Sequence, residues 1–164
     1  MYETVQEGLR KIPGMNCFFC SPADLNPDGL NLVFASKKGG AGTQFNLAKK
    51  FQSYPGMGHG GILSGILDET MAYAGIFELH CLPVTRSLQV MFRSRVPSRE
   101  VHTCEAQIIS STQVSFEAEA TIRNLKGQRL MSASAQFAIL SQKAAEKILC
   151  MGKLDLGDHF RLVH

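Results

Sequence analysis

The chain has 164 residues, of which 45% are hydrophobic and 19% are charged. These values are typical of a globular protein, and the length suits one domain with a substantial core. The formal net charge of +3 is too small to indicate nucleic-acid binding. The first residues lack the basic start and apolar core of a secretory signal, so we expect a cytoplasmic protein.

The amino-terminal segment predicts a short helix followed by a loop. Over residues 2–12, apolar side chains recur at helical spacing: Val5, Leu9 and Ile12. Cys17 and Cys20 then form a C-x-x-C pair, which could bind zinc or carry out redox chemistry. A structural zinc site normally needs four ligands, and neither a second such pair nor a paired histidine follows. We therefore expect buried, reduced thiols and no metal here.

Two strands are expected before the middle of the chain. Residues 22–29 are rich in turn-forming types, and apolar and polar side chains then alternate from Leu30 to Phe34. The run Lys37-Lys38-Gly39-Gly40 predicts a hairpin turn into a second strand at about residues 42–48.

A long apolar helix is expected from Gly60 to Phe77. Its only charged residues are the adjacent Asp68 and Glu69, so it lacks the polar stripe of a surface helix and should be enclosed by the fold. The same two acids argue against a membrane-spanning helix. A buried carboxylate costs at least several kcal/mol unless hydrogen bonds or a shifted pKa offset it, so two of them indicate a function.

Helical spacing separates the two acids. Small residues surround Asp68 on one row of the helix: Gly61, Gly65, Ala72 and Gly75. Bulky residues surround Glu69 on the next row: Ile62, Ile66, Tyr73 and Ile76. Asp68 is therefore expected to be the reactive group. Alternatively, the small row only lets a strand pack closely, and both acids bind loop amides.

Glycines crowd the start of this helix, at Gly56, Gly58, Gly60 and Gly61. They allow a sharp turn and leave amides accessible where a helix N-terminus favours negative charge. An oxyanion could bind at Gly61, with Asp68 about two turns further along. The spacing also matches G-x-G-x-x-G, but no buried strand precedes it and no βαβ unit follows, which makes a nucleotide-binding oxidoreductase a distant alternative.

Four alternating strands are expected after the helix, at about residues 87–93, 104–108, 114–123 and 130–139, with a turn at 124–127. Their short connections predict an antiparallel meander, and its apolar face needs a cover. We therefore expect an α+β fold in which a twisted antiparallel sheet wraps around the long central helix. Ser141 should cap a short closing helix that runs to Leu149.

His59-Gly60-Gly61, Asp68, and the strand from Thr85 to Phe92 followed by Val96-Pro97 resemble the hotdog-fold acyl-CoA thioesterases of the phenylacetate-degradation (PaaI) type. The likeness implies a single hotdog domain over residues 1–164, with a core at 29–140, an amino-terminal helix and loop at 1–28, and a carboxy-terminal helix and tail at 141–164. It also implies homodimers joined sheet edge to sheet edge, in some cases paired into tetramers, with active sites at the subunit interface.

By the same resemblance, Asp68 is the catalytic base or nucleophile and the Gly61 amide polarises the thioester carbonyl. Thr85, supplied by the partner subunit, positions water. The residues expected to contact substrate are His59, Gly60, Ser53, Gln52 and Glu69. Some relatives have an asparagine where this chain has Ser53, beside Gln52, so either residue could replace it. No cofactor or metal is implied.

The expected function is therefore hydrolysis of an acyl-CoA to a free acid and CoA. Two alternatives stay open: a hotdog protein that binds acyl-CoA without cleaving it, and another acyl-thioester enzyme such as an enoyl-CoA hydratase. Basic residues at one strand end could meet the CoA phosphates or simply be solvated: Arg93, Arg95 and Arg99. The acyl group itself depends on the packing of Met71, Tyr73, Phe77 and Phe92.

Overall fold

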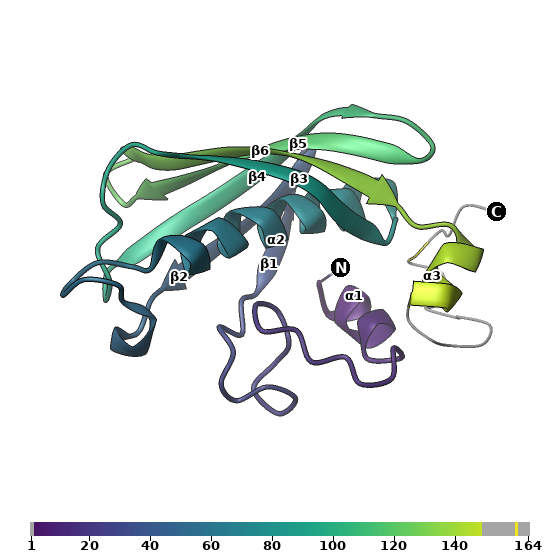
Figure 1. The fold of residues 1–164 in the computed structure, drawn as a ribbon, viewed down its shortest axis with the longest axis horizontal. Coiled ribbons are helices and arrows are strands. Elements are labelled where there is room, and N and C mark those ends of the chain that lie inside the picture. The colour runs from purple at the N-terminus through teal and green to yellow at the C-terminus, as the bar shows by residue number, and fades with distance from the viewer. Residues whose placement is uncertain (1, 149–159, 161–164) are drawn as a thin grey trace.

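The computed structural model describes residues 2–148 and residue 160. In chain order its elements are α1 (Tyr2–Leu9), β1 (Phe34–Lys37), β2 (Gly40–Asn46), the short 3-10 helix η1 (Lys49–Phe51), α2 (Gly60–Leu79), β3 (Pro83–Phe92), β4 (Val101–Ser111), β5 (Ser115–Asn124), β6 (Arg129–Ile139) and α3 (Gln142–Ile148). One sheet lies across α2, and the amino-terminal segment lies on the opposite side of that helix (Figure 1).

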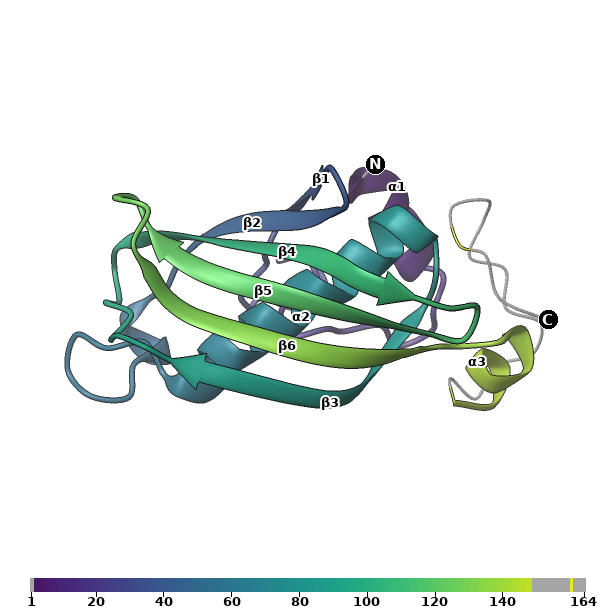
Figure 2. The same cartoon turned by 90° about the horizontal axis from the view of Figure 1, so that it is seen from above.

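The sheet has six strands in the order β1-β2-β4-β5-β6-β3, and every neighbouring pair is antiparallel. Seen from above, β1 and β3 form its two edges (Figure 2). The sheet around one long helix is the expected hotdog fold, which is confirmed.

The expectation of a simple meander is wrong at one connection. Strands β4, β5 and β6 follow one another, but β3 pairs with β6 and not with β4. Residues 93–100 carry the chain from the β3 edge back to the middle of the sheet. Hairpin loops usually have about two to five residues, and this longer connection can cross the end of the sheet instead.

The core lies between the sheet and α2. The predicted alternation places Phe116 of β5 and Phe137 of β6 on the helix side, where their rings stack with centroids 4.7 Å apart. The Phe116 ring also lies against Gly75 of α2, where a Cβ atom would come within 2.3 Å of it. A glycine is therefore needed at this point of closest approach between helix and sheet.

The other side of α2 is covered by the amino-terminal segment. Phe34 stacks on Tyr73 at 4.0 Å between centroids, and the Gln6 side chain donates a 2.7 Å hydrogen bond to the Tyr73 hydroxyl. Phe19 lies on Gly65, where a Cβ atom would come within 2.0 Å of its ring. The helix is therefore apolar on all sides because the sheet and the amino-terminal segment enclose it between them.

Two element boundaries differ from expectation near the start of the chain. Helix α1 ends at Leu9 and gives way to turns, although the apolar spacing continues to Ile12. The strand expected from Leu30 begins only at Phe34, because Asn31 has a φ of 49°, which an extended strand does not allow. Leu30 and its neighbour Leu32 instead bond through their amides to loop residues 18 and 19.

The carboxy-terminal helix α3 starts as expected, since the Ala144 amide donates a 3.2 Å hydrogen bond to the Ser141 hydroxyl. Leu149, the last residue expected in that helix, lies outside the described residues. Within the described part of the chain, none of the helices combines the length and apolar character needed to cross a bilayer.

Candidate active site

The glycine turn before α2 is held by the β3–β4 connection. The Gly58 amide donates to the carbonyl of Val96 at 2.9 Å, and the Ser98 amide donates to the carbonyl of Gly56 at 3.1 Å. Gly56 has a φ of 78°, and a Cβ atom at Gly58 would come within 2.8 Å of Leu47. The backbone of the turn therefore favours glycine at Gly56, while a side chain at Gly58 would have to displace the end of Leu47.

His59 caps the helix. Its Nδ1 atom accepts a 3.0 Å hydrogen bond from the Gly61 amide, while its own backbone carbonyl accepts from the Leu63 amide at 3.0 Å. The amide expected to polarise a substrate carbonyl is thus already engaged in the isolated chain. Among the described residues, the first-turn amides of Gly60 and Ile62 keep no such partner.

Asp68 lies farther along α2, half-buried, and meets Thr85 of β3. The Thr85 hydroxyl donates a 2.9 Å hydrogen bond to Asp68 Oδ1. Burial raises the pKa of Asp68, and this hydrogen bond opposes part of the rise. The two residues meet within one copy of the chain, and the expected role of Thr85 from a partner subunit stays a prediction.

The helix keeps Asp68 away from its own N-terminus. Gly61 and Asp68 are seven residues apart, which corresponds to about 10 Å along a helix axis. A carboxylate and an oxyanion donor that act on one carbonyl must lie much closer together, within roughly 3 Å of the reacting atoms. The two predicted catalytic groups therefore do not meet on one carbonyl within a single chain.

A cavity of about 340 Å³ opens beside the helix N-terminus. Gly60 and Phe92 line it, and a Cβ atom at Gly60 would come within 3.3 Å of the Phe92 ring. Ser53 lines it too, together with two of the three basic residues at the end of β3, Arg93 and Arg95. An apolar wall with two guanidinium groups at its margin suits a ligand that is partly hydrocarbon and partly anionic.

Two residues expected to contact substrate are engaged elsewhere. The Gln52 side chain donates a short hydrogen bond to the Ser98 hydroxyl, which ties the loop before the glycine turn to the crossover connection. Glu69 faces the amino-terminal loop, where the Cys17 thiol donates to it at 3.7 Å. The helical-row argument had placed bulky neighbours around Glu69, but it could not show which segment covers it.

Burial raises the pKa of Glu69 to about 8. The pKa of Cys17 is lowered to about 6, first through its hydrogen bond with Cys20 and then through nearby amides, although burial opposes this. The pKa of Cys20 is raised by the same hydrogen bond and by burial. The three groups therefore share little negative charge, and they form a cluster separate from Asp68.

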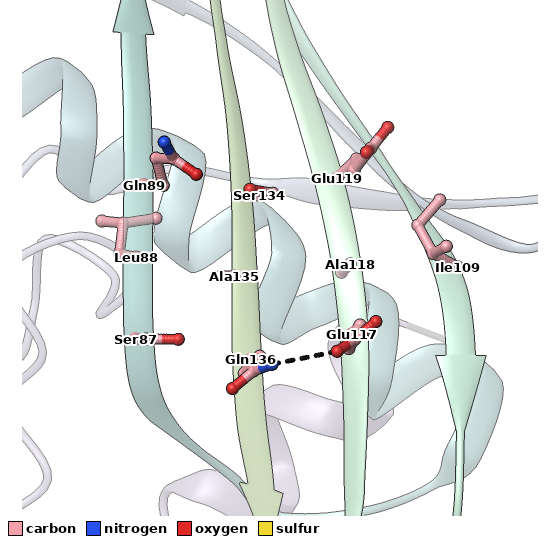
Figure 3. Close-up of a pocket in the computed structure, with 10 residues that line it drawn as sticks. All are labelled: Ser87, Leu88, Gln89, Ile109, Glu117, Ala118, Glu119, Ser134, Ala135 and Gln136. Carbon is pink, nitrogen blue, oxygen red and sulfur yellow. Dashed lines mark hydrogen bonds between the residues drawn. The ribbon is translucent and has the colours of Figure 1, made fainter.

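A second hollow lies on the outer face of the sheet, between β3, β6, β5 and β4 (Figure 3). Its walls mix polar and apolar side chains, and the Gln136 side chain donates a 3.0 Å hydrogen bond to Glu117 across it. Neither Asp68 nor the helix N-terminus lines this hollow. It therefore plays no part in the candidate site.

The comparisons with known proteins bear on this arrangement. Residues 56–131, which run from the glycine turn into β6, match the family model described as the thioesterase superfamily. The match spans less than half of the chain and shows its similarity to that superfamily. No curated protein matches the chain, and membership of the PaaI type stays a prediction.

Solved structures share the fold over about two thirds of this chain. One is a thioesterase superfamily protein with a TM-score of 0.64 and 22% sequence identity. The aligned region covers 68% of this chain and 58% of that protein, so this chain spans less than two thirds of that protein's length. A hypothetical thioesterase from Streptococcus pneumoniae, solved with coenzyme A, has a TM-score of 0.61 at 16% identity, with coverage of 66% and 85%. A Streptococcus mutans protein bound to acetyl-CoA has a TM-score of 0.62 at 16% identity, with coverage of 66% and 88%.

Proposed function

We propose that this protein is an acyl-CoA thioesterase in which Asp68 acts as the general base or nucleophile. The observation that carries the proposal is the half-buried Asp68 carboxyl on the central helix, which accepts a hydrogen bond from Thr85 at 2.9 Å and has a raised pKa. A perturbed carboxyl on a segment that matches the thioesterase superfamily and starts at a glycine turn fits the needs of acyl transfer.

As a general base, Asp68 removes a proton from a water molecule as the water oxygen attacks the thioester carbonyl carbon. Negative charge develops on the carbonyl oxygen, and first-turn amides of α2 stabilise it. When the carbon–sulfur bond breaks, the thiolate of CoA leaves and takes the proton from Asp68. Thr85 holds the carboxyl in place throughout.

The site is assembled across two copies of the chain. Because α2 separates its own N-terminus from Asp68 by about 10 Å, the amides and the carboxyl that serve one substrate come from different subunits. Strand β3 is an exposed edge of the sheet next to α2. When two chains pair their β3 strands about a two-fold axis, their α2 helices run antiparallel. The N-terminus of one helix then passes the Asp68 turn of the other.

The cavity beside Gly60 is where CoA enters. Arg93 and Arg95 meet the phosphates at its margin, while the apolar wall with Phe92 contacts the pantetheine arm. Two proteins of the same fold were solved with coenzyme A or acetyl-CoA, which supports the same ligand class here.

The test is hydrolysis of a panel of aryl and aliphatic acyl-CoAs by the wild type, Asp68→Asn and Glu69→Gln, with a chelator present. We expect Asp68→Asn to keep its fold and assembly but to lose about 100-fold or more in kcat, the usual contribution of a general base. Glu69→Gln is the matched control, since it neutralises the adjacent acid and should lose much less.

Three results would count against the proposal. Equal losses in both variants would show that Asp68 has no special role. Saturable acyl-CoA binding without turnover by the wild type would favour the non-catalytic binding protein. Hydration of an enoyl-CoA would favour the hydratase, although His59 already caps the helix and lies about two and a half turns from Asp68.

A further inference from the structure

The amino-terminal loop brings both members of the C-x-x-C pair against the central helix. One ligand atom each from Cys17, Cys20 and Glu69 lies within 4.8 Å of the other two. Neither cysteine is in a disulfide. This cluster is distinct from the candidate active site, because the adjacent Asp68 turns toward Thr85 instead.

The turn that carries the cysteines is shaped around the first sulfur. The amides of Phe19 and Cys20 both point to Cys17 Sγ, at 3.3 and 3.5 Å, and the Ser21 amide closes the turn on the Cys17 carbonyl at 3.2 Å. Amide donors stabilise a thiolate, which is the form of cysteine that binds metal ions. A disulfide needs no such donors.

The loop is also fixed relative to the helix. Phe19 lies on Gly65, one turn before Glu69, and only glycine leaves room for its ring. The amides of Leu30 and Leu32 bind the carbonyls of Phe18 and Phe19, each at 2.8 Å. The three side chains are thus held together by their surroundings before any ligand arrives.

A cation is needed only when the three groups are ionised together. Two thiolates and a carboxylate in a largely buried place would be costly without compensation, so the metal-free cluster keeps most of its protons. Among the described residues, the recorded ion pairs are Arg10 with Asp24 and Lys37 with Glu105, and neither involves Glu69. A divalent metal ion that displaces these protons would supply the compensating positive charge.

We propose that Cys17, Cys20 and Glu69 bind a zinc-type divalent cation, with the remaining coordination position open to water or another ligand. Two thiolates select soft or borderline ions over calcium and magnesium, and three protein ligands with one open position is a common arrangement for zinc. This revises the expectation that the C-x-x-C pair holds no metal, because the third ligand comes from α2.

The experiment titrates metal-free, reduced protein with Zn²⁺, followed by calorimetry and native mass spectrometry, and with Co²⁺, followed by thiolate-to-cobalt absorption. We expect about one ion per chain, because the described residues of each chain form one such cluster. Cys20→Ser and Glu69→Gln should weaken binding by about 100-fold or more, beyond the 10–100-fold typical for residues that only support a ligand. Cys81→Ser, which removes another buried thiol, is the matched control and should bind normally.

Thermal unfolding gives a second readout. Saturating Zn²⁺ should raise the Tm of the wild type and of Cys81→Ser by about 5–10 °C, as expected at roughly 100 times Kd for a chain of this size. It should leave Glu69→Gln unchanged. Glu69→Gln keeps the size of the side chain, so it remains informative if a cysteine variant fails to fold.

The proposal is overturned if the wild type binds no ion under reducing conditions or if Glu69→Gln binds as tightly as the wild type. It is also overturned if the cysteines close into a disulfide, seen as a loss of two hydrogens in mass, while the protein shows no metal affinity. Acyl-CoA hydrolysis is not part of this readout, so the two proposals fail independently.

Discussion

At the residue scale, neighbouring acids on one helix acquire different surroundings. Asp68 and Glu69 are adjacent in sequence but point about 100° apart around the helix axis, so one meets β3 and the other meets the amino-terminal loop. Both have a raised pKa because of burial. Only Asp68 has a hydroxyl donor that opposes the rise, and this donor belongs to the strand at the open edge of the sheet.

This contact predicts a pH effect. The hydrogen bond from Thr85 lowers the pKa of Asp68, so Thr85→Val should raise that pKa further. A general base acts when deprotonated, and the acidic limb of the kcat/KM profile should therefore move to higher pH in the variant. The profile should be measured with a chelator present, so that bound metal does not contribute.

Ser87→Ala is the control for this shift, since it removes another exposed hydroxyl from β3. Its acidic limb should coincide with that of the wild type. A Thr85→Val profile that keeps the wild-type limb would mean that this hydrogen bond does not tune the catalytic carboxyl.

At the element scale, α2 is shaped by two glycines that receive aromatic rings from opposite sides. Gly75 accommodates Phe116 from the sheet, and Gly65 accommodates Phe19 from the loop. The two rings differ in how tightly their surroundings restrict their movement. Phe116 is buried and stacked on Phe137, whereas Phe19 is half-buried on a loop.

The difference predicts unequal costs for the same substitution. Alanine gains about 0.5–1 kcal/mol over glycine in a helix, while overpacking a rigid core costs about 1–3 kcal/mol. Gly75→Ala should therefore lower the free energy of unfolding by about 1–2 kcal/mol. Gly65→Ala should cost less, because the half-buried Phe19 side chain can turn away from the new methyl group while its backbone stays in place.

Urea unfolding of the two variants measures this directly. The midpoint should fall more for Gly75→Ala than for Gly65→Ala, with similar slopes. The reverse order would show that the loop is held more tightly on α2 than the core ring is held on the sheet.

At the scale of the whole molecule, β3 is an edge strand that pairs within the chain only with β6. It is a ten-residue edge strand, and its apolar side chains stay exposed: Val84 at 41%, Leu88 at 37%, Met91 at 52% and Phe92 at 55%. A long apolar edge invites pairing with another strand. The proposed cross-subunit site requires this pairing to bring carboxyl and amides together.

Leu88→Glu should therefore weaken the dimer and lower acyl-CoA hydrolysis at the same time, because it places a charge on the pairing edge. Sedimentation at several concentrations, combined with activity at the same concentrations, tests the link. Leu125→Glu is the matched control, since Leu125 is 71% exposed in the turn between β5 and β6. A monomeric Leu88→Glu that keeps full turnover would place a complete active site in one chain.

Local patterns in the sequence were enough to predict the long enclosed helix, the glycine turn before it and most of the strands. The alternation in β5 and β6 is confirmed for Phe116 and Phe137, which lie in the core, but not at its start, where Val114 is exposed and Leu130 is buried. Helical spacing also separated Asp68 from Glu69. These features depend on periodicity and on backbone preferences, which neighbouring residues determine among themselves.

Contacts between distant segments were decided only by the tertiary structure. They include the place of β3 beside β6, the hydrogen bond of Thr85 to Asp68 within one chain, and the meeting of Glu69 with Cys17 and Cys20. The hydrogen bond from the Gly61 amide to the His59 side chain is local in sequence, but it depends on the rotamer of His59, which the sequence pattern does not specify. Spacing along the chain describes one element at a time, whereas these contacts arise from how packed elements cross, and so the sequence alone determined the parts while packing determined which chemical groups meet.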